Sequence, residues 1–486
     1  MKRLDDLDIL VRQGEFAAVE RVLNELTIKR IKRNEAVRYA NLAKRVGKPL
    51  MALSILNPII RAASPLEVPP TEQEKMEYAD SLRKVGAIAE AEQLLHGIDE
   101  LRFPEALMFK AYCSISRWEY EKAIPLLERY IQIPTIAPYA GLAARLNLSA
   151  GYVAENRLQD AARVLGELRE IAGKEKHWLI LGGTLELSAQ VQIRGGDFDE
   201  ALRILGESAE TLKNAGHIQR LWVSKWTAIA KSFKSGRVLP ELREVVNTAA
   251  KAHNWETIRD CLYYEALIAR DGELMTRIYF GTPYRSFRNK IASTAGEWLS
   301  LPERYTDHHS FGVTKKIIHV SEGTIDGNQK LFNAGQVLHR LFGLLAQDFF
   351  KPLPVVETFG RLFPEEYFNP STSPNRIHQA VMRLRKLLLE EDVDVQITEI
   401  NGAYRIESGP TAAICLRREN EPLDARIIKL SRVRKEFGAS EFNVQQAQGI
   451  LGDSPATIKR LVRWAVEDGQ LSVVGAGPRT RYRFSA

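Results

Sequence analysis

The sequence predicts a mainly α-helical chain, in which an N-terminal α-solenoid of helix pairs precedes two small α+β domains. Three observations lead to this fold class: a repeat of 32 to 40 residues in the N-terminal half, β-branched segments with turn signals after residue 311, and a final basic segment with a hairpin pattern. At 486 residues the chain exceeds what one hydrophobic core accommodates, so several domains are expected. The expected boundaries are 1–280 for the helical repeats, 281–308 for a linker, 309–408 for the first small domain, 409–424 for a second linker and 425–486 for the second small domain.

An alanine occurs at equivalent positions through the N-terminal half, with the spacing of helix-pair repeats. It follows a short turn and precedes large apolar residues at helical spacing. The recurrences are Ala18, Ala52, Ala91, Ala123, Ala161 and Ala201. Two helices joined by a short turn cannot bury both apolar faces alone, whereas stacked pairs can, so the repeat predicts a superhelix with a concave face.

This pattern resembles the tetratricopeptide repeat (TPR), in the degenerate and slightly lengthened form found in bacterial regulators, over about residues 1–280. The resemblance implies a concave face that binds a protein partner, a peptide or a ligand, or that mediates self-association as a homodimer. Aromatic side chains in this region are expected in the core rather than in a ligand-stacking site. They include Trp178, Trp222, Trp226 and Trp255.

The first small domain is expected to hold three helices with strands on either side. Strands are expected at Val313–Val320 and Gly323–Ile325, and helices at Val337–Ala346, at Val355–Leu362 and from Ser373-Pro374 onward. Serine is a natural N-cap and proline suits the first helical position. In the third helix, Ile377, Val381, Leu384 and Leu388 form an apolar stripe. Asn401-Gly402, between Val395–Ile400 and Ala403–Glu407, predicts a type I′ turn.

Three helices followed by a hairpin form a winged helix. The exposed face of its third helix carries basic and amide side chains, which can read base edges and bind phosphates. The predicted DNA-binding residues are Arg376, Gln379, Arg383 and Lys386. The sequences IHQAVMRLRKL (377–387) and ITEINGAYRI (397–406) resemble the effector domain of OmpR/PhoB-type regulators. This resemblance covers about Phe311–Glu407 and implies a helix in the major groove and a wing at the minor groove. The chain departs from the family at Ile400, where a basic wing residue is usual.

The second small domain repeats this order of elements and holds most of the excess charge. The whole chain has a formal net charge of +7, of which residues 425–486 contribute +6. Helices are expected at Ala425–Phe437 and Val444–Leu451 and from Ser454-Pro455 onward, with a hairpin of Leu471–Val474 and Arg479–Phe484. Asn443 and Gln446 predict a capping box, and Gly438 a helix C-cap.

The third helix of this domain begins within LGDSPATIKRL (451–461), which resembles the helix-turn-helix of several families of bacterial regulators. Cations on the helix and on one face of the last strand are suited to phosphate contacts. The predicted DNA-binding residues are Thr457, Lys459, Arg460, Arg463, Arg479, Arg481 and Arg483.

The sequence therefore predicts a sequence-specific transcriptional regulator that binds double-stranded DNA through two winged helices. The repeats would receive a protein, peptide or ligand signal. The alternative is a non-enzymatic assembly scaffold, in which repeats and winged helices mediate protein contacts.

Several other classes of protein are not expected. The sequence contains no phosphate loop, metalloprotease, hydrolase or dinucleotide motif, so we expect no enzyme activity and no cofactor. Asp307-His308-His309 is expected to be a loop rather than a metal site. No segment approaches the ~20 apolar residues of a membrane span, no secretory signal is evident, and Cys113, Cys261 and Cys415 are too dispersed for a disulfide framework. A cytoplasmic protein without membrane contact is expected.

Overall fold

The computed structural model describes residues 4–12, 15–62, 64, 68–308, 316–418, 425–475, 477 and 480–485. The chain forms two compact units, which are described separately. The first contains Met1–Leu301, Gln347–Gln379 and Thr398–Arg405, and the second contains Pro302–Ala346, Ala380–Ile397 and Ile406–Ala486.

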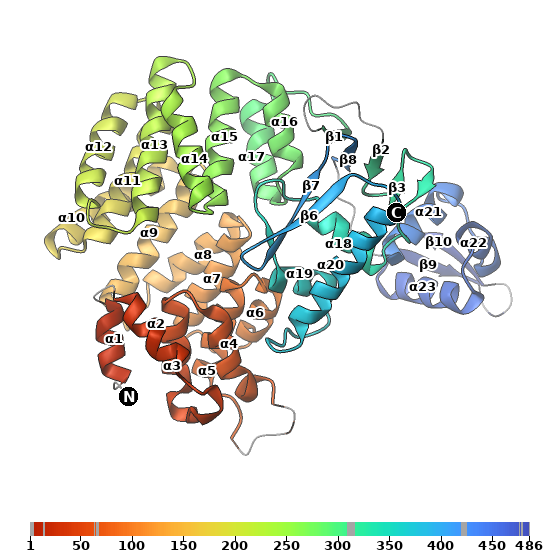
Figure 1. Cartoon of the computed structure of the whole chain (residues 1–486), viewed down its shortest axis with the longest axis horizontal. Coiled ribbons are helices and arrows are strands. Elements are labelled where there is room, and N and C mark those ends of the chain that lie inside the picture. Colours follow the sequence, from red (N-terminus) through yellow and green to blue (C-terminus); the bar gives the residue numbers. More distant parts are fainter. Residues whose placement is uncertain are drawn as a thin grey trace. The chain divides into compact units, whose positions relative to one another are not determined.

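The repeat region is a series of helix pairs (Figure 1). The first helices of the pairs are α1 (Leu4–Arg12), α3 (Arg33–Arg45), α5 (Glu72–Lys84), α7 (Glu105–Ser116), α9 (Pro138–Ala154), α11 (Trp178–Gly195), α13 (His217–Ser235) and α15 (Trp255–Ala269). The second helices are α2 (Phe16–Asn24), α4 (Pro49–Ile60), α6 (Ile88–Leu95), α8 (Tyr120–Ile131), α10 (Leu158–Lys174), α12 (Phe198–Thr211), α14 (Pro240–Lys251) and α16 (Gly272–Phe280). A short 3-10 helix, η1 (Ile28–Arg30), precedes α3, and α17 (Arg285–Ala295) follows the last pair.

The recurring alanine occupies the same place in successive pairs. It is the fourth residue of the second helix from α4 to α12, and there each copy is fully buried, namely Ala52, Ala91, Ala123, Ala161 and Ala201. Ala18, in the first pair, is partly buried. The small side chain allows the helices to pack closely, so the predicted helix pairs are confirmed. At the same position α14 carries Arg243 and α16 carries Met275, which is why the sequence marks these pairs poorly.

The prediction of core tryptophans is wrong for two of the four. Trp226 is only 6% exposed, but Trp178 and Trp222 are 54% and 41% exposed. Trp178 is the first residue of α11, and Trp222 lies between the buried Leu221 and Val223. Because successive helical residues point about 100° apart, burial of both neighbours turns Trp222 outward.

The first small domain contains the three predicted helices, α18 (Val337–Leu345), α19 (Val355–Leu362) and α20 (Ser373–Glu390). A five-stranded sheet has the order β1-β8-β2-β3-β4, formed by β1 (Arg304–His308), β2 (Lys316–His319), β3 (Thr324–Ile325), β4 (Gln329–Lys330) and β8 (Ala412–Arg417). A second sheet has the order β5-β7-β6, formed by β5 (Leu353–Pro354), β6 (Val395–Ile400) and β7 (Ala403–Ser408). Asn401 and Gly402 both have positive φ, 51° and 74°, as the predicted type I′ turn requires.

Three local expectations for this domain differ from the structure. The segments expected as linkers contain α17, β1 and β8, because β1 and β8 pair antiparallel over a long sequence separation that local patterns do not reveal. Asp307 and His308 therefore belong to a strand rather than a loop. Ser373 is the first residue of α20 and not its cap, since its Oγ accepts a hydrogen bond from the Asn369 amide at 2.9 Å. Residues 313–315 of the first expected strand lie outside the described residues.

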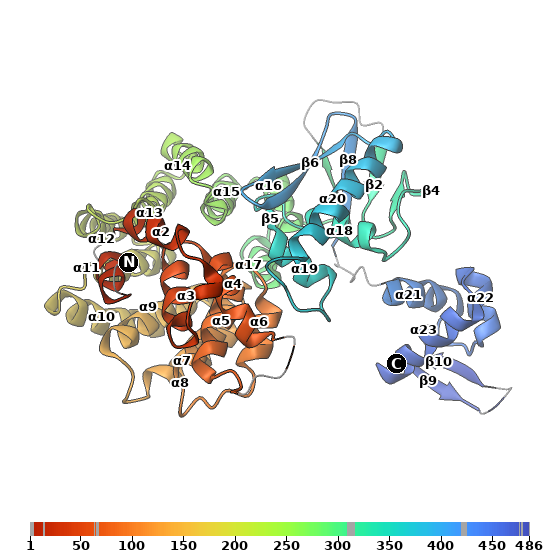
Figure 2. The same cartoon turned by 60° about the horizontal axis from the view of Figure 1, so that its bottom comes forward.

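The second small domain is a winged helix of α21 (Ala425–Phe437), α22 (Val444–Leu451), α23 (Pro455–Glu467), β9 (Leu471–Val474) and β10 (Arg481–Phe484) (Figure 2). The two strands pair antiparallel. Asn443 and Gln446 form the predicted capping box, and Gly438 has the positive φ of a C-cap, 54°. The core includes Leu430, Val433, Phe442, Ile458, Leu461, Val462 and Phe484. The predicted fold class, helix-pair repeats followed by two winged helices, is confirmed.

Among the described residues, none of the helices combines the length and apolar character needed to cross a bilayer.

Because Ala201 is fully buried between helices, Ala201→Leu should overpack the pair and cost about 1–3 kcal/mol. Ala209→Leu, at an exposed position of the same helix, should change stability little. Urea unfolding followed by circular dichroism compares the two variants. Equal unfolding midpoints would contradict the account of the recurring alanine.

His339 on α18 is a buried histidine in the core of the first small domain. Its ring is fully buried, its Nδ1 accepts from the Gly335 amide at 2.8 Å, and its Nε2 lies 2.6 Å from the Val320 carbonyl oxygen. This arrangement requires a neutral ring with its proton on Nε2. Burial lowers the pKa of His339, so protonation is easier in the unfolded chain than in the folded one.

Stability should therefore be complete above the unfolded histidine pKa of about 6.5 and decline as pH falls below it. His339→Gln should reduce that decline, because the amide does not titrate. Thermal melts of both proteins at about pH 7.5 and about pH 5 measure the effect. An equal loss of melting temperature on acidification in both proteins would remove His339 as its source.

Candidate nucleic-acid interface

The third helix of the second winged helix has one buried and one cationic face. Ile458, Leu461, Val462 and Ala465 are buried, as the 3.6-residue period requires. The opposite face exposes Lys459, Arg460 and Arg463. In the part of the chain that the structure describes, none of these three cations forms an ion pair, so their charges are available to a polyanion.

The strand that follows adds cations at alternate positions. In β10, Arg481 and Arg483 are exposed, whereas Phe484 is buried, so the predicted alternation is confirmed for the described residues. Arg483 forms an ion pair with Glu441 at 2.6 Å. Arg479 lies outside the described residues.

Other polar side chains of this domain form contacts within it that stabilise its fold. The Oγ1 of Thr457 lies 3.0 Å from the Oγ of Ser454, which caps α23 by accepting from the Thr457 amide. Lys429 pairs with Asp453 at 2.7 Å, and the guanidinium of Arg426 lies 4.4 Å from the ring centre of Trp464. Among the described residues, exposed cations without an ion-pair partner therefore lie on α23 and β10 and also on α21, where Arg432 and Lys435 are exposed.

The corresponding helix of the first winged helix, α20, is amphipathic as predicted. Its core residues Ile377, Val381, Leu384 and Leu388 are buried. Gln379 and Arg383 are exposed, and Lys386 lies 3.6 Å from Glu390 in a solvent-exposed pair. Exposed pairs of this kind contribute little to stability, so Lys386 can exchange its partner for a phosphate.

Arg376 is less available for a DNA contact than its position on the helix suggests. It forms an ion pair with Glu366, with a second contact of 3.1 Å, and its guanidinium lies 4.0 Å from the ring centre of Phe363. The pKa of Arg376 is raised by its hydrogen bond to Glu366. The side chain thus ties the start of α20 to the loop that precedes it.

Two contacts orient the wing against α20. The Nε and Nη2 of Arg385 donate to the carbonyl oxygen of Ile397 at 3.0 and 2.5 Å. The Nδ1 of His378 lies 2.6 Å from the Tyr404 hydroxyl. In the wing itself Glu399 is exposed and Ile400 is partly buried, and the residue directly before the turn is thus apolar rather than cationic.

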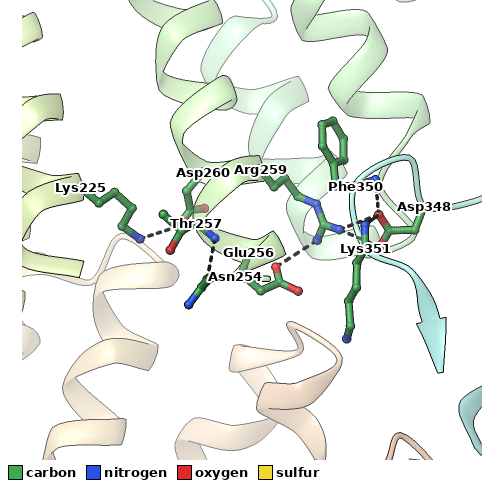
Figure 3. Close-up of polar contacts among 9 residues, drawn as sticks. All are labelled: Lys225, Asn254, Glu256, Thr257, Arg259, Asp260, Asp348, Phe350 and Lys351. Atoms are coloured by element: carbon green, nitrogen blue, oxygen red, sulfur yellow. Dashed lines mark hydrogen bonds and ion pairs between the residues drawn. The ribbon is translucent and has the colours of Figure 1, made fainter. Parts of the chain in front are cut away.

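Sequence reasoning missed a buried ionic contact within the first unit (Figure 3). Arg259 on α15 has no exposed surface, and its Nη2 donates to both carboxylate oxygens of Asp348 at 2.8 and 2.7 Å. Its Nη1 donates to Glu256 at 3.1 Å. Burial by itself would lower the pKa of Arg259, but the charges of Asp348 and Glu256 raise it above its ordinary value.

Asp348 also organises its own loop. Its Oδ1 accepts from the backbone amides of Phe350 and Lys351, both at 2.9 Å. The carboxylate therefore joins a helix of the repeats to the segment between α18 and β5. Because Arg259 and Asp348 are 89 residues apart, no local period in the sequence indicates the contact.

Further bonds hold the same part of the first winged helix within the first unit. The Phe349 amide donates to the Gly281 carbonyl oxygen at 3.0 Å, and the Phe368 amide donates to Glu90 at 2.9 Å. The guanidinium of Arg61 lies 3.6 Å from the ring centre of Tyr367. Residues 347–368 are thus bound both to the early repeats around α4–α6 and to the late ones around α15–α16.

Among the described residues, no cluster of three His, Cys, Asp or Glu side chains could hold a metal ion.

No protein-family model matches the chain, and no curated protein sequence matches it. Among solved structures, the chain is similar to the apo form of RapI, with 12% identity and a TM-score of 0.37, over 60% of this chain and 93% of that one. It is also similar to a Rap protein complexed with competence and sporulation factor, with 12% identity and a TM-score of 0.41, over 80% of this chain and 98% of that one. Likenesses at these scores carry no argument about function. The resemblance of residues 311–407 to OmpR/PhoB-type effector domains stays a prediction.

Arg259→Met should destabilise the first unit by about 3–5 kcal/mol, because Asp348 would keep a carboxylate without its buried counter-charge. Arg169→Met is the matched control, since Arg169 forms a solvent-exposed pair with Glu207 at 2.7 Å, a class of pair that contributes about 0–1 kcal/mol. Hydrogen exchange of α15 and of residues 347–379 gives the measurement. Unchanged protection in Arg259→Met would contradict the structural role of the pair.

Proposed function

We propose that the chain is a sequence-specific DNA-binding transcriptional regulator. In this proposal the helical repeats receive a protein, peptide or ligand signal, and the two winged helices contact double-stranded DNA. The chain has no catalytic role. The observation that carries the proposal is the set of exposed cations without ion-pair partners on the second winged helix, within its described residues.

The position of these cations favours DNA over a generic basic surface. Lys459, Arg460 and Arg463 lie on the third helix of a winged helix, and Arg481 on its hairpin. These are the two elements that approach the duplex in helix-turn-helix proteins. The segment also holds nearly all of the net positive charge of the chain, and a concentrated positive charge gains affinity for DNA by releasing counterions.

The two winged helices are suited to different parts of DNA binding. On α20, the exposed Gln379 and Arg383 combine an amide and a guanidinium, which can make bidentate contacts with adenine and guanine edges. On α23 the exposed polar side chains at the centre of the helix are all cations, Lys459, Arg460 and Arg463, which are suited to phosphate contacts. We assign more of the sequence readout to the first domain and more of the backbone contact to the second. Tethering both in one chain adds affinity through effective concentration.

A signal on the repeats has a structural route to the first domain. Arg259 lies in the repeats, and Asp348 lies between α18 and β5 of that domain. A ligand or partner that changes the position of α15 would act on Asp348 and so on residues 347–379, which include the start of α20. This coupling is part of the proposal, as is self-association through the repeats.

The alternative of a protein-assembly scaffold is supported by one set of contacts. Arg376 and Arg483 are both paired with carboxylates of their own domains, so two of the predicted DNA-binding residues already have counter-charges. If the chain is a scaffold, the other predicted DNA-binding cations are simply charged side chains exposed to solvent.

The deciding experiment is the binding of the full chain to mixed genomic duplexes, measured by fluorescence anisotropy from about 50 to about 200 mM salt. Affinity should fall steeply with salt. Arg460→Ala should weaken binding about 3- to 10-fold and reduce the slope of log affinity against log salt by about 1. Arg243→Ala, at a 74% exposed arginine of the repeats, is the control and should leave both quantities unchanged.

Absence of binding at the lowest salt would refute the proposal and favour the scaffold. Binding that Arg460→Ala leaves unchanged in affinity and slope would exclude α23 from the contact.

A further inference from the structure

A cavity of about 790 Å³ lies within the repeat region. Its lining comes from the C-terminal ends of α9, α11 and α13, from α15 and α17, and from Glu121 on α8. The side chains that characterise it are Glu121, Arg194, Phe233, Tyr263, Tyr264 and Lys290. Concave sites that combine aromatic walls with a few charged groups are the usual form of a small-molecule site.

The ammonium of Lys290 is the unusual group in this cavity. Its Nζ lies 4.5 Å from the ring centre of Tyr263 and 5.5 Å from those of Tyr264 and Phe287. It forms no ion pair in the described part of the chain. Burial lowers the pKa of Lys290 to about 8, because the rings replace water without supplying a full counter-charge.

The other charges of the cavity restrict the ligand that could supply this counter-charge. Glu121 and Glu155 are exposed lining residues. Partial desolvation and the charge of Glu121 raise the pKa of Glu155, and both carboxylates oppose the binding of a further anion. A polyanion such as a phosphate monoester would meet this repulsion, whereas a single negative charge at Lys290 would meet less of it.

We propose that the cavity binds an aromatic monocarboxylate, with its carboxylate on Lys290 and its ring against Phe233, which is the partly exposed ring of the lining. Tyr263 and Tyr264 are themselves buried, and Tyr264 supports Phe233 from behind, since the two rings pack edge to face at 5.9 Å. The proposal deepens the proposed function by naming the class of signal that the repeats receive, and in that respect rests on it.

The cavity is joined to the contact with the first winged helix by one helix. Tyr263 follows Arg259 by one turn of α15, so the two side chains lie on the same side of that helix. A ligand in the cavity, whose lining includes residues of α15, therefore acts on the helix that holds Asp348. Ligand binding is nevertheless measured without DNA, so failure of the site and failure of the proposed function are distinguishable.

The test uses two fluorinated probes of the same shape, 4-fluorophenylacetate and its neutral analogue 4-fluorophenylacetamide, with the full chain and ¹⁹F NMR. The wild-type chain should bind the acid roughly 10- to 100-fold more tightly than the amide. Lys290→Met should remove this preference, and Lys290→Arg should retain it. Lys231→Met, at an exposed lysine outside this cavity, is the control and should bind as the wild type does.

The pH dependence separates a charge contact from mere packing. The acid should bind with constant affinity below about pH 7.5 and more weakly as pH rises through the pKa of Lys290, whereas the amide should show no such change. The other charged or titratable groups around Lys290 are Glu121, Glu155, Arg194, Lys225, Asp260, Tyr263 and Tyr264. The tyrosines have pKa values raised by burial, so they stay neutral over this range.

Equal affinity for acid and amide, no binding of the acid at millimolar concentration, or an acid preference that persists in Lys290→Met would each overturn the proposal. The comparison of acid with amide on the unmodified chain remains decisive even if Lys290→Met fails to fold.

Discussion

Arg259 is the residue on which the first unit most depends, because a guanidinium without solvent exposure is stable only when its charge is paired. Asp348 provides that charge with both carboxylate oxygens, and it simultaneously accepts two backbone amides of its own loop. The pair therefore fixes the position of α15 and the conformation of the α18–β5 loop together. The bonds of Phe349 to Gly281 and of Phe368 to Glu90 extend the same attachment along the segment.

This attachment changes how the first winged helix is understood. Sequence patterns treat it as a separate reader at the end of a solenoid. Residues 347–379, however, belong to the compact unit of the repeats, and α20 continues from that unit into the second one. The helix proposed to read DNA thus begins in one unit and ends in the other. Because Arg259 on α15 binds Asp348 with both carboxylate oxygens, α15 is connected directly to the loop between α18 and β5 of this domain.

Features with a local period were predictable from the sequence, and those set by distant contacts were not. The alanine period located the first six helix pairs, because their close packing favours a small residue at that position, whereas α14 and α16 lack it. Asn401-Gly402 predicted its turn because few other residues adopt positive φ. The β1–β8 pairing and the Arg259–Asp348 pair both depend on partners remote in sequence. In the candidate interface, Gln379, Arg383, Lys459, Arg460, Arg463 and Arg481 were placed on exposed faces as expected. The contacts of Arg376 with Glu366 and Phe363 could not be predicted from helical spacing.

The central claim is that this chain recognises a particular DNA sequence, and selection from random duplexes tests it most directly. Successive rounds of binding by the full chain, followed by sequencing, should enrich one motif. The double variant Gln379→Ala/Arg383→Ala should lose that enrichment while retaining affinity for duplex DNA, because phosphate contacts of the second domain remain. A recovered pool with no motif, or with the same motif for the variant, would contradict the account.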